Sequence, residues 1–132
     1  MKKFASMILA ILMVFSLAAA ASAAGAYSDM PTGWSQSAMQ AAVDNGLMTG
    51  NEKGQLLPKG AVTRAQAATM LVNALGGTAK ADLSKFSDVK TGDWFYEKMA
   101  IAVNMGIFAG TGSKLEPNKD LTRELAAVVV SR

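Results

Sequence analysis

The chain of 132 residues contains 13 Lys and Arg against 10 Asp and Glu, and it contains neither His nor Cys. The absence of His and Cys excludes imidazole bases, thiol nucleophiles, disulfides and thiolate zinc sites. The acidic residues are scattered and mostly flank turns, which gives no support to a paired-carboxylate hydrolase site. We therefore expect a protein without catalytic residues, a metal or a cofactor.

The first residues have the three parts of a secretory signal. Two lysines precede an apolar run from Met7 to Ala20, and small residues follow up to Ala23. This run is shorter than the ~20 residues that span a bilayer, so the pattern favours a cleaved signal helix over a transmembrane anchor. We expect residues 1–23 to be a signal peptide and the processed chain to be secreted, with no membrane contact after cleavage.

Loss of the signal peptide also changes the charge. Without its two lysines, 11 basic residues stand against 10 acidic ones. A charge so close to neutral does not indicate binding to nucleic acid, because such binding needs a strongly basic surface.

The rest of the sequence repeats after about sixty residues, which is a sign of tandem structural units. The tryptophans are 60 residues apart and the Thr-Arg pairs 59, so the two units differ by one loop residue. The matching positions are Tyr27 and Phe86, Asp29 and Asp88, Trp34 and Trp94, Gly46 and Gly106, Gly50 and Gly110, Pro58 and Pro117, Thr63 and Thr122, and Arg64 and Arg123.

Each unit is predicted to fold as helix, loop and helix. In the first helix of both units, apolar residues recur at helical spacing and mark one buried face, and a glycine then ends the helix. These apolar residues are Met39, Ala42 and Val43 in the first unit, and Met99, Ala102 and Val103 in the second. The second helices are predicted to begin after the N-caps Thr63 and Thr122.

The second helix of the first unit has its own apolar stripe, formed by Ala67, Ala68, Leu71, Val72 and Leu75. We expect an all-α fold with repeat 1 at residues 24–77, a linker at 78–85 and repeat 2 at 86–132. Repeat 2 stops at Arg132 before a counterpart of Leu75. Either its last helix frays or the sequence is a fragment of a longer protein, and we favour the fragment.

This set of motifs resembles the S-layer homology family from Tyr27 to Arg132. Repeats of that family run from Phe-x-Asp-Val through a Trp, a glycine step and a Pro to a helix that starts with Thr-Arg-Ala-Glu. The resemblance implies a partial pseudo-threefold helical bundle with glycan grooves between neighbouring repeats. Only two repeats are present where three usually close the bundle, and Gln66 stands where the family has Glu.

The resemblance also implies a function. It implies a non-catalytic module that anchors a protein non-covalently at the cell wall or S-layer surface of a bacterium. The implied partner is a secondary cell-wall polymer, a peptidoglycan-linked glycan that is often pyruvylated. Other S-layer homology repeats, or another copy of this chain, are further expected partners. The alternative is a structural or protein-binding module of the envelope that binds no glycan.

Carried over by position, eight residues are implied to face the ligand. They are Arg64, Arg123, Asp29, Asp88, Trp34, Trp94, Gly50 and Gly110. A guanidinium in the first turn of a helix suits a pyruvyl carboxylate, because it offers paired, charge-assisted hydrogen bonds next to free helix amides.

Each of these residues also has a purely structural interpretation, which the sequence leaves open. Each Arg would then pair with the Asp of its own repeat, and each Trp would supply core area at a helix start. The Asp residues would cap or brace the first helix, and the Gly residues would only form turns.

Overall fold

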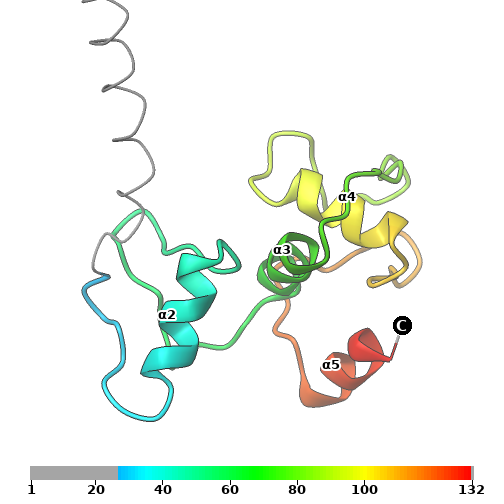
Figure 1. The fold of residues 1–132 in the computed structure, drawn as a ribbon. Helices are drawn as coiled ribbons and strands as arrows, with labels where there is room; N and C mark the ends of the chain where they lie inside the picture. The colour runs from blue at the N-terminus through cyan, green and yellow to red at the C-terminus, as the bar shows by residue number, and fades with distance from the viewer. Residues whose placement is uncertain (1–26, 132) are drawn as a thin grey trace, which may run out of the picture.

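The computed structural model describes residues 27–131, which contain four helices (Figure 1). They are α2 (Gln36–Asp44), α3 (Arg64–Leu75), α4 (Tyr96–Asn104) and α5 (Arg123–Val130). In this range the extended backbone forms only two isolated bridges and no strand, so the predicted all-α fold of helix-loop-helix units is confirmed. The predicted signal peptide lies outside the described residues. No helix between residues 27 and 131 has both the length and the apolar character needed to cross a membrane.

The second helix of each repeat begins at its predicted cap. Thr63 Oγ1 accepts the N–H of Gln66 at 3.3 Å, and Gln66 Oε1 accepts the N–H of Thr63 at 2.9 Å, which completes a capping box. Thr122 Oγ1 likewise accepts the N–H of Leu125 at 3.2 Å. The Gln that departs from the family pattern therefore performs the same capping as a Glu.

Glycines end three of the helices in the left-handed conformation that costs them little. Gly76 closes α3 with φ 72°, and the residues that follow the C-caps of α2 and α4, Gly46 and Gly106, have φ 67° and 75°. The sequence therefore predicted these helix ends correctly.

The hydrophobic core lies between α3 and α4 and continues into the loops of repeat 2. α3 and α4 pack against each other, whereas α2 and α5 have no close backbone contact with another described helix, and α5 contributes Val129 to the core (Figure 1). The buried core residues are Ala65, Ala67, Ala68, Val72, Leu83, Phe86, Val89, Phe95, Met99, Ala100, Ile101, Ala102, Ile107, Phe108, Leu115 and Val129.

Repeat 1 departs from the predicted symmetry. Met39, Ala42 and Val43 of α2 are only half-buried, although their counterparts Met99 and Ala102 are fully buried. The prediction of a buried face on α2 is therefore only partly correct, because within residues 27–131 no second helix packs on α2 as α3 packs on α4. Leu75, expected in the stripe of α3, is 61% exposed at the end of that helix.

Candidate functional site

Two equivalent aspartates hold the loop that precedes the second helix of each repeat. In repeat 2, Asp88 accepts the N–H of Leu115 at 2.9 Å and that of Glu116 at 2.7 Å. Glu116 has φ 53°, a left-handed conformation that non-glycine residues rarely adopt, and the carboxylate secures it there. The corresponding contacts in repeat 1 are Asp29 Oδ1 to Leu56 N at 2.7 Å and Asp29 Oδ2 to Leu57 N at 2.8 Å.

These hydrogen bonds lower the pKa of both carboxyl groups. The N–H of Leu56 is the largest cause for Asp29, whose pKa lies below its ordinary value. Burial acts to raise the pKa of Asp88, but the N–H groups of Leu115, Glu116 and Asp88 itself and the charge of Lys114 act the other way, and this pKa is lowered overall. Both aspartates brace the loop that leads to the second helix, and neither caps the first helix.

Arg64 of repeat 1 reaches into repeat 2. Its Nε donates to the carbonyl oxygen of Leu115 at 2.8 Å, and its Nη2 donates to that of Ala109 at 3.1 Å. The guanidinium lies over the ring of Phe108, 5.0 Å from the centroid, and the residue is only 6% exposed. Arg64 therefore forms no pair with Asp29 of its own repeat, and it joins the two repeats instead.

The guanidinium of Arg64 is buried but not sealed. Burial lowers its pKa, and the nearby carboxylates of Glu116 and Asp88 oppose that shift, so the group stays charged. No partner is recorded for Nη1 among residues 27–131, and in this range no fully enclosed side-chain nitrogen or oxygen lacks a partner. Nη1 therefore keeps some contact with solvent at the junction of the repeats.

An open hollow of about 440 Å³ lies in repeat 2 beside this arginine. Phe108 and Ala109, which both contact Arg64, form part of its wall. Lys85 stands at the same hollow with its Nζ over the ring of Phe86, 5.0 Å from the centroid. The remaining lining residues are Val103, Gly106, Gly110 and Gly112. The hollow thus combines one cation, Lys85, with two aromatic rings and a glycine-rich wall, and Arg64 contacts two of the lining residues without being one of them.

Gly50 and Gly110 are needed where the chain passes an aromatic ring. A Cβ on Gly110 would meet the ring of Phe86 and would lie 2.7 Å from the carbonyl oxygen of Lys114. A Cβ on Gly50 would meet the ring of Tyr27, whose hydroxyl also accepts the Gly50 N–H at 3.2 Å. Both glycines allow close packing, and only Gly110 lies among the residues that line the hollow at Lys85.

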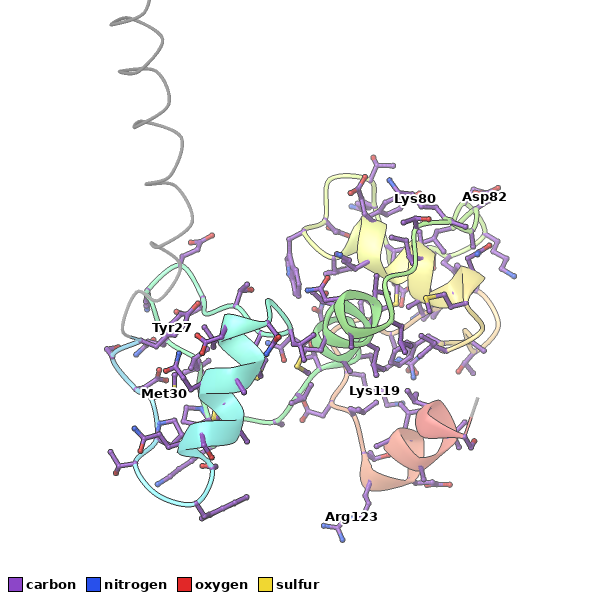
Figure 2. All side chains as sticks on the ribbon, in the orientation of Figure 1. Tyr27, Met30, Lys80, Asp82, Lys119 and Arg123 are labelled. Carbon is purple, nitrogen blue, oxygen red and sulfur yellow. The ribbon has the colours of Figure 1, made fainter. Side chains whose placement is uncertain are left out.

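Arg123 lies far from this hollow. It is exposed at the start of α5 and extends away from the rest of the molecule (Figure 2). No hydrogen bond or ion pair of its guanidinium is recorded within the described part of the chain. The two equivalent arginines therefore have different environments, because α3 packs on α4 of repeat 2, whereas α5 packs on no other helix of residues 27–131.

Both tryptophans lie on the surface. Trp34 is 95% exposed and Trp94 is 66% exposed, with the Trp94 ring edge-on to Phe95 at 5.4 Å. The interpretation of these residues as core is wrong. In repeat 2 the turn before α4 points Phe95 inward, with 5% exposure, and leaves its neighbour Trp94 outside.

Sequence reasoning missed Lys85 and Phe108 at the hollow. Lys85 directly precedes the Phe86-Ser87-Asp88 motif, and this adjacency was the available signal. Phe108 carries no local signal, because its contact with Arg64 joins residues far apart in the sequence.

The fold and this junction define a tandem-repeat module in which the second helix of repeat 1, α3, locks repeat 1 onto repeat 2. A family model described as the S-layer homology domain matches residues 26–68 and 85–126. The chain therefore belongs to the S-layer homology domain family, and the resemblance inferred from its motifs is confirmed.

Relatives of the chain include surface-layer proteins. It is 39% identical over 100 residues to the surface-layer 125 kDa protein of Lysinibacillus sphaericus, covering 75% of this chain and 8% of the relative. It is 38% identical over 108 residues to an S-layer protein of Bacillus licheniformis, covering 80% and 12%. It is 29% identical over 106 residues to the exoglucanase XynX of Acetivibrio thermocellus, covering 80% and 10%.

The chain thus spans about a tenth of the length of these curated relatives. S-layer homology domains of S-layer proteins serve as cell-surface anchoring modules, which agrees with the expected location at the cell surface. The enzyme name among the relatives belongs to a multidomain protein that carries such a module, and it gives no activity to this chain.

Proposed function

We propose that this chain anchors a protein at the bacterial surface by binding an acidic, pyruvylated secondary cell-wall glycan at the junction of its two repeats. No catalysis is involved. The observation that carries the proposal is an open hollow that Lys85 lines together with Phe108 and Ala109, the two lining residues that Arg64 contacts. Two cations beside aromatic and glycine surfaces form a site suited to a sugar that bears a carboxylate.

The chemistry of the two cations is complementary. Arg64 has two of its donor nitrogens committed to carbonyl oxygens, which holds the guanidinium in place, while no partner is recorded for Nη1 among residues 27–131. A fixed guanidinium loses little entropy when it binds a carboxylate. Lys85 is exposed, and its flexible side chain can bring the ammonium charge to the carboxylate of the ligand. A pyruvyl ketal, whose carboxylate is fixed to the sugar ring, matches this combination.

The other implied residues take supporting roles in this proposal. Asp88 holds the loop that carries the carbonyl of Leu115, and Gly110 gives the sugar access to the backbone. Trp34 and Trp94 offer exposed rings on which sugar faces stack. Asp29 and Gly50 hold the equivalent loop of repeat 1, and Arg123 provides the equivalent cation of repeat 2.

Co-sedimentation with purified cell-wall sacculi tests the proposal. We expect the wild-type chain to bind intact sacculi and to lose binding after chemical removal of the secondary polymer. Lys85→Glu should bind weakly, because an anion then faces the carboxylate. Lys53→Glu is the matched control, since it makes the same charge change at an exposed turn of repeat 1. Unchanged binding to stripped sacculi would contradict the proposal and favour a protein-binding role.

A further inference from the structure

The two repeats share one occupied junction, and each leaves one equivalent surface unoccupied. α3 of repeat 1 packs on α4 of repeat 2. By the repeat alignment, α5 corresponds to α3 and α2 corresponds to α4. Within the described residues α5 has no following repeat to pack on, and α2 has no preceding helix packed on it. The molecule therefore presents a donor surface at α5 and an acceptor surface on repeat 1.

The occupied junction shows what the acceptor surface must supply. Besides the two side-chain bonds of Arg64, three backbone bonds join the repeats. They run from Arg64 N to Lys119 O at 2.9 Å, from Ala65 N to Pro117 O at 2.9 Å and from Leu121 N to Val62 O at 2.7 Å. Repeat 2 thus supplies the N–H of Leu121 and four carbonyl groups, three of which (those of Leu115, Pro117 and Lys119) lie on the loop that Asp88 braces and one of which belongs to Ala109.

Repeat 1 reproduces this loop residue by residue. Leu57 has the same φ of 53° as Glu116, and Asp29 braces it as Asp88 braces its counterpart. The Gly60 N–H donates to Leu57 O at 2.8 Å, as the Lys119 N–H donates to Glu116 O at 3.1 Å. The carbonyl groups equivalent to the occupied ones belong to Thr49, Leu56, Pro58 and Gly60, and no partner is recorded for them among residues 27–131.

The start of α5 carries the same hydrogen-bonding groups as the start of α3. The guanidinium of Arg123 is exposed, and no acceptor is recorded in the described range for the backbone N–H groups of Arg123 and Glu124. The carbonyl of Leu121, which corresponds to that of Val62, likewise has no recorded donor there. The groups that α3 and its approach use in these five hydrogen bonds therefore have counterparts available at α5, whereas Asn73 of α3, which accepts a hydrogen bond from Lys98 of α4, corresponds to Arg132 outside the described residues.

We infer that α5 of one copy docks on repeat 1 of a second copy, in the way that α3 docks on repeat 2 within the chain. Arg123 would then donate to the carbonyls of Leu56 and Thr49, and the N–H of Glu124 would donate to the carbonyl of Pro58. The inference extends an interface that the chain already contains, so it needs no new mode of packing.

Two sequence differences between the repeats favour a second copy of the chain as the partner. Glu124 stands where α3 has Ala65, and Lys59 stands where the facing loop has Asn118. The backbone bond from Ala65 to Pro117 places those two positions next to each other, so docking brings the Glu124 and Lys59 charges together. Opposite charges across an interface favour the contact of α5 with repeat 1 over a contact between two identical surfaces.

The association is head-to-tail and weaker than the internal junction. Different surfaces meet, so the contact is heterologous and uses one donor and one acceptor per chain. Met48 replaces Phe108 under the guanidinium, and Gln40 and Ala41 replace Ala100 and Ile101 on the helix face. The interface between copies therefore lacks the aromatic ring under the guanidinium and buries less apolar area than the internal junction. Docking would also bring Arg123 beside Gly50 and Tyr27, the counterparts of the hollow's Gly110 and Phe86.

Sedimentation velocity on the secreted, processed chain tests the inference. We expect the wild-type mass to rise above that of a monomer as concentration increases. Arg123→Ala removes the donor, and Thr49→Lys puts a cation beside the acceptor; both sites are exposed, so folding should be intact. Each variant alone should remain monomeric. An equimolar mixture should form dimers of one chain of each kind, because the first variant keeps its acceptor and the second keeps its donor.

Thr49→Asp serves as the control for the acceptor site. It alters the same exposed position but should strengthen association, since an anion attracts the arriving guanidinium. A wild-type chain that stays monomeric at all concentrations would overturn the inference, as would a mixture that fails to associate. If Arg123→Ala and Thr49→Lys each associated like wild type, the inference would also be overturned, because the contact would then involve other residues. None of these results depends on glycan, so they are separate from the test of wall binding.

Discussion

The Nε of Arg64 in the first repeat donates to the carbonyl oxygen of Leu115 in the second repeat at 2.8 Å, across 51 positions of sequence. Asp88 holds the same Leu115 through its N–H at 2.9 Å. The arginine and the aspartate thus act on one loop residue from opposite sides. This relationship fixes the junction at which the candidate glycan site lies.

Replacing Arg64 should weaken the junction far more than replacing its equivalent. Arg64→Ala removes a buried guanidinium and leaves the carbonyl of the buried Leu115, and that of Ala109, without their donor, and we expect a loss of about 2–4 kcal/mol in the free energy of unfolding. Arg123→Ala should change it by less than about 0.5 kcal/mol, because that side chain is exposed. Urea unfolding followed by circular dichroism, at concentrations where the chain is monomeric, measures both. Equal losses in the two variants would contradict the assigned role of Arg64.

Gly110 should not tolerate even a methyl group. Gly110→Ala places a Cβ against the Phe86 ring and the Lys114 carbonyl, and overpacking of this kind costs about 1–3 kcal/mol. Gly92→Ala is the matched control, since nothing lies within 4 Å of its added Cβ and its φ is not in the left-handed range. Thermal unfolding of the two variants should show a lower midpoint for Gly110→Ala alone.

Stability should fall in acid. The pKa values of Asp29 and Asp88 are lower in the folded chain than in the unfolded one, so the folded state binds fewer protons. Their contribution is therefore complete above the unfolded pKa of about 4 and is lost as the pH falls through the folded values. Thermal midpoints measured between about pH 2 and pH 7 should decline in this window.

The double variant Asp29→Asn/Asp88→Asn distinguishes the contribution of these two carboxyl groups to the acid response from that of the other acidic residues. It should be less stable than wild type near neutral pH and should lose less stability on acidification. Some decline should remain, because the pKa values of Asp82 and Glu97 are also lowered by hydrogen bonds to Ser84 and Lys80. A pH profile parallel to that of wild type would show that the braces contribute nothing to the acid response.

The exposed tryptophans should affect binding without affecting folding. Trp34→Ala removes a ring that is 95% exposed, so the free energy of unfolding should change by less than about 0.5 kcal/mol. If the ring stacks on a sugar, retention on sacculi should fall by roughly tenfold or less. Trp34→Phe, which keeps an aromatic face, should retain most of the binding. Full retention by Trp34→Ala would remove this residue from the site.

Features of the fold set by neighbouring residues were predictable from the sequence. The caps at Thr63 and Thr122 and the glycine after each first helix depend on contacts within one helical turn, and the structure has them as predicted. The repeat itself was visible because the same residues recur at one spacing. These features need no knowledge of how the repeats pack.

The parts that depend on the junction were not predictable. Arg64 finds its acceptors in the second repeat, at Ala109 and Leu115, so its own motif could not reveal its partners. Likewise, Trp94 and Phe95 are adjacent aromatics with opposite burial, and only the turn before α4 decides which one enters the core. The apolar residues of α2 are only half-buried because no other helix in the described part of the chain packs on α2, and no local pattern encodes this packing.

Calorimetric titration with purified secondary cell-wall polymer tests the central claim most directly. The account predicts that the wild-type chain binds the pyruvylated polymer and that Lys85→Glu weakens binding by about tenfold or more, equivalent to about 1.4 kcal/mol. Lys53→Glu should bind like wild type, and polymer stripped of its pyruvyl groups should bind neither form. Equal affinity of wild type and Lys85→Glu, or undiminished binding of the stripped polymer, would contradict an acidic-glycan site at the junction of the repeats.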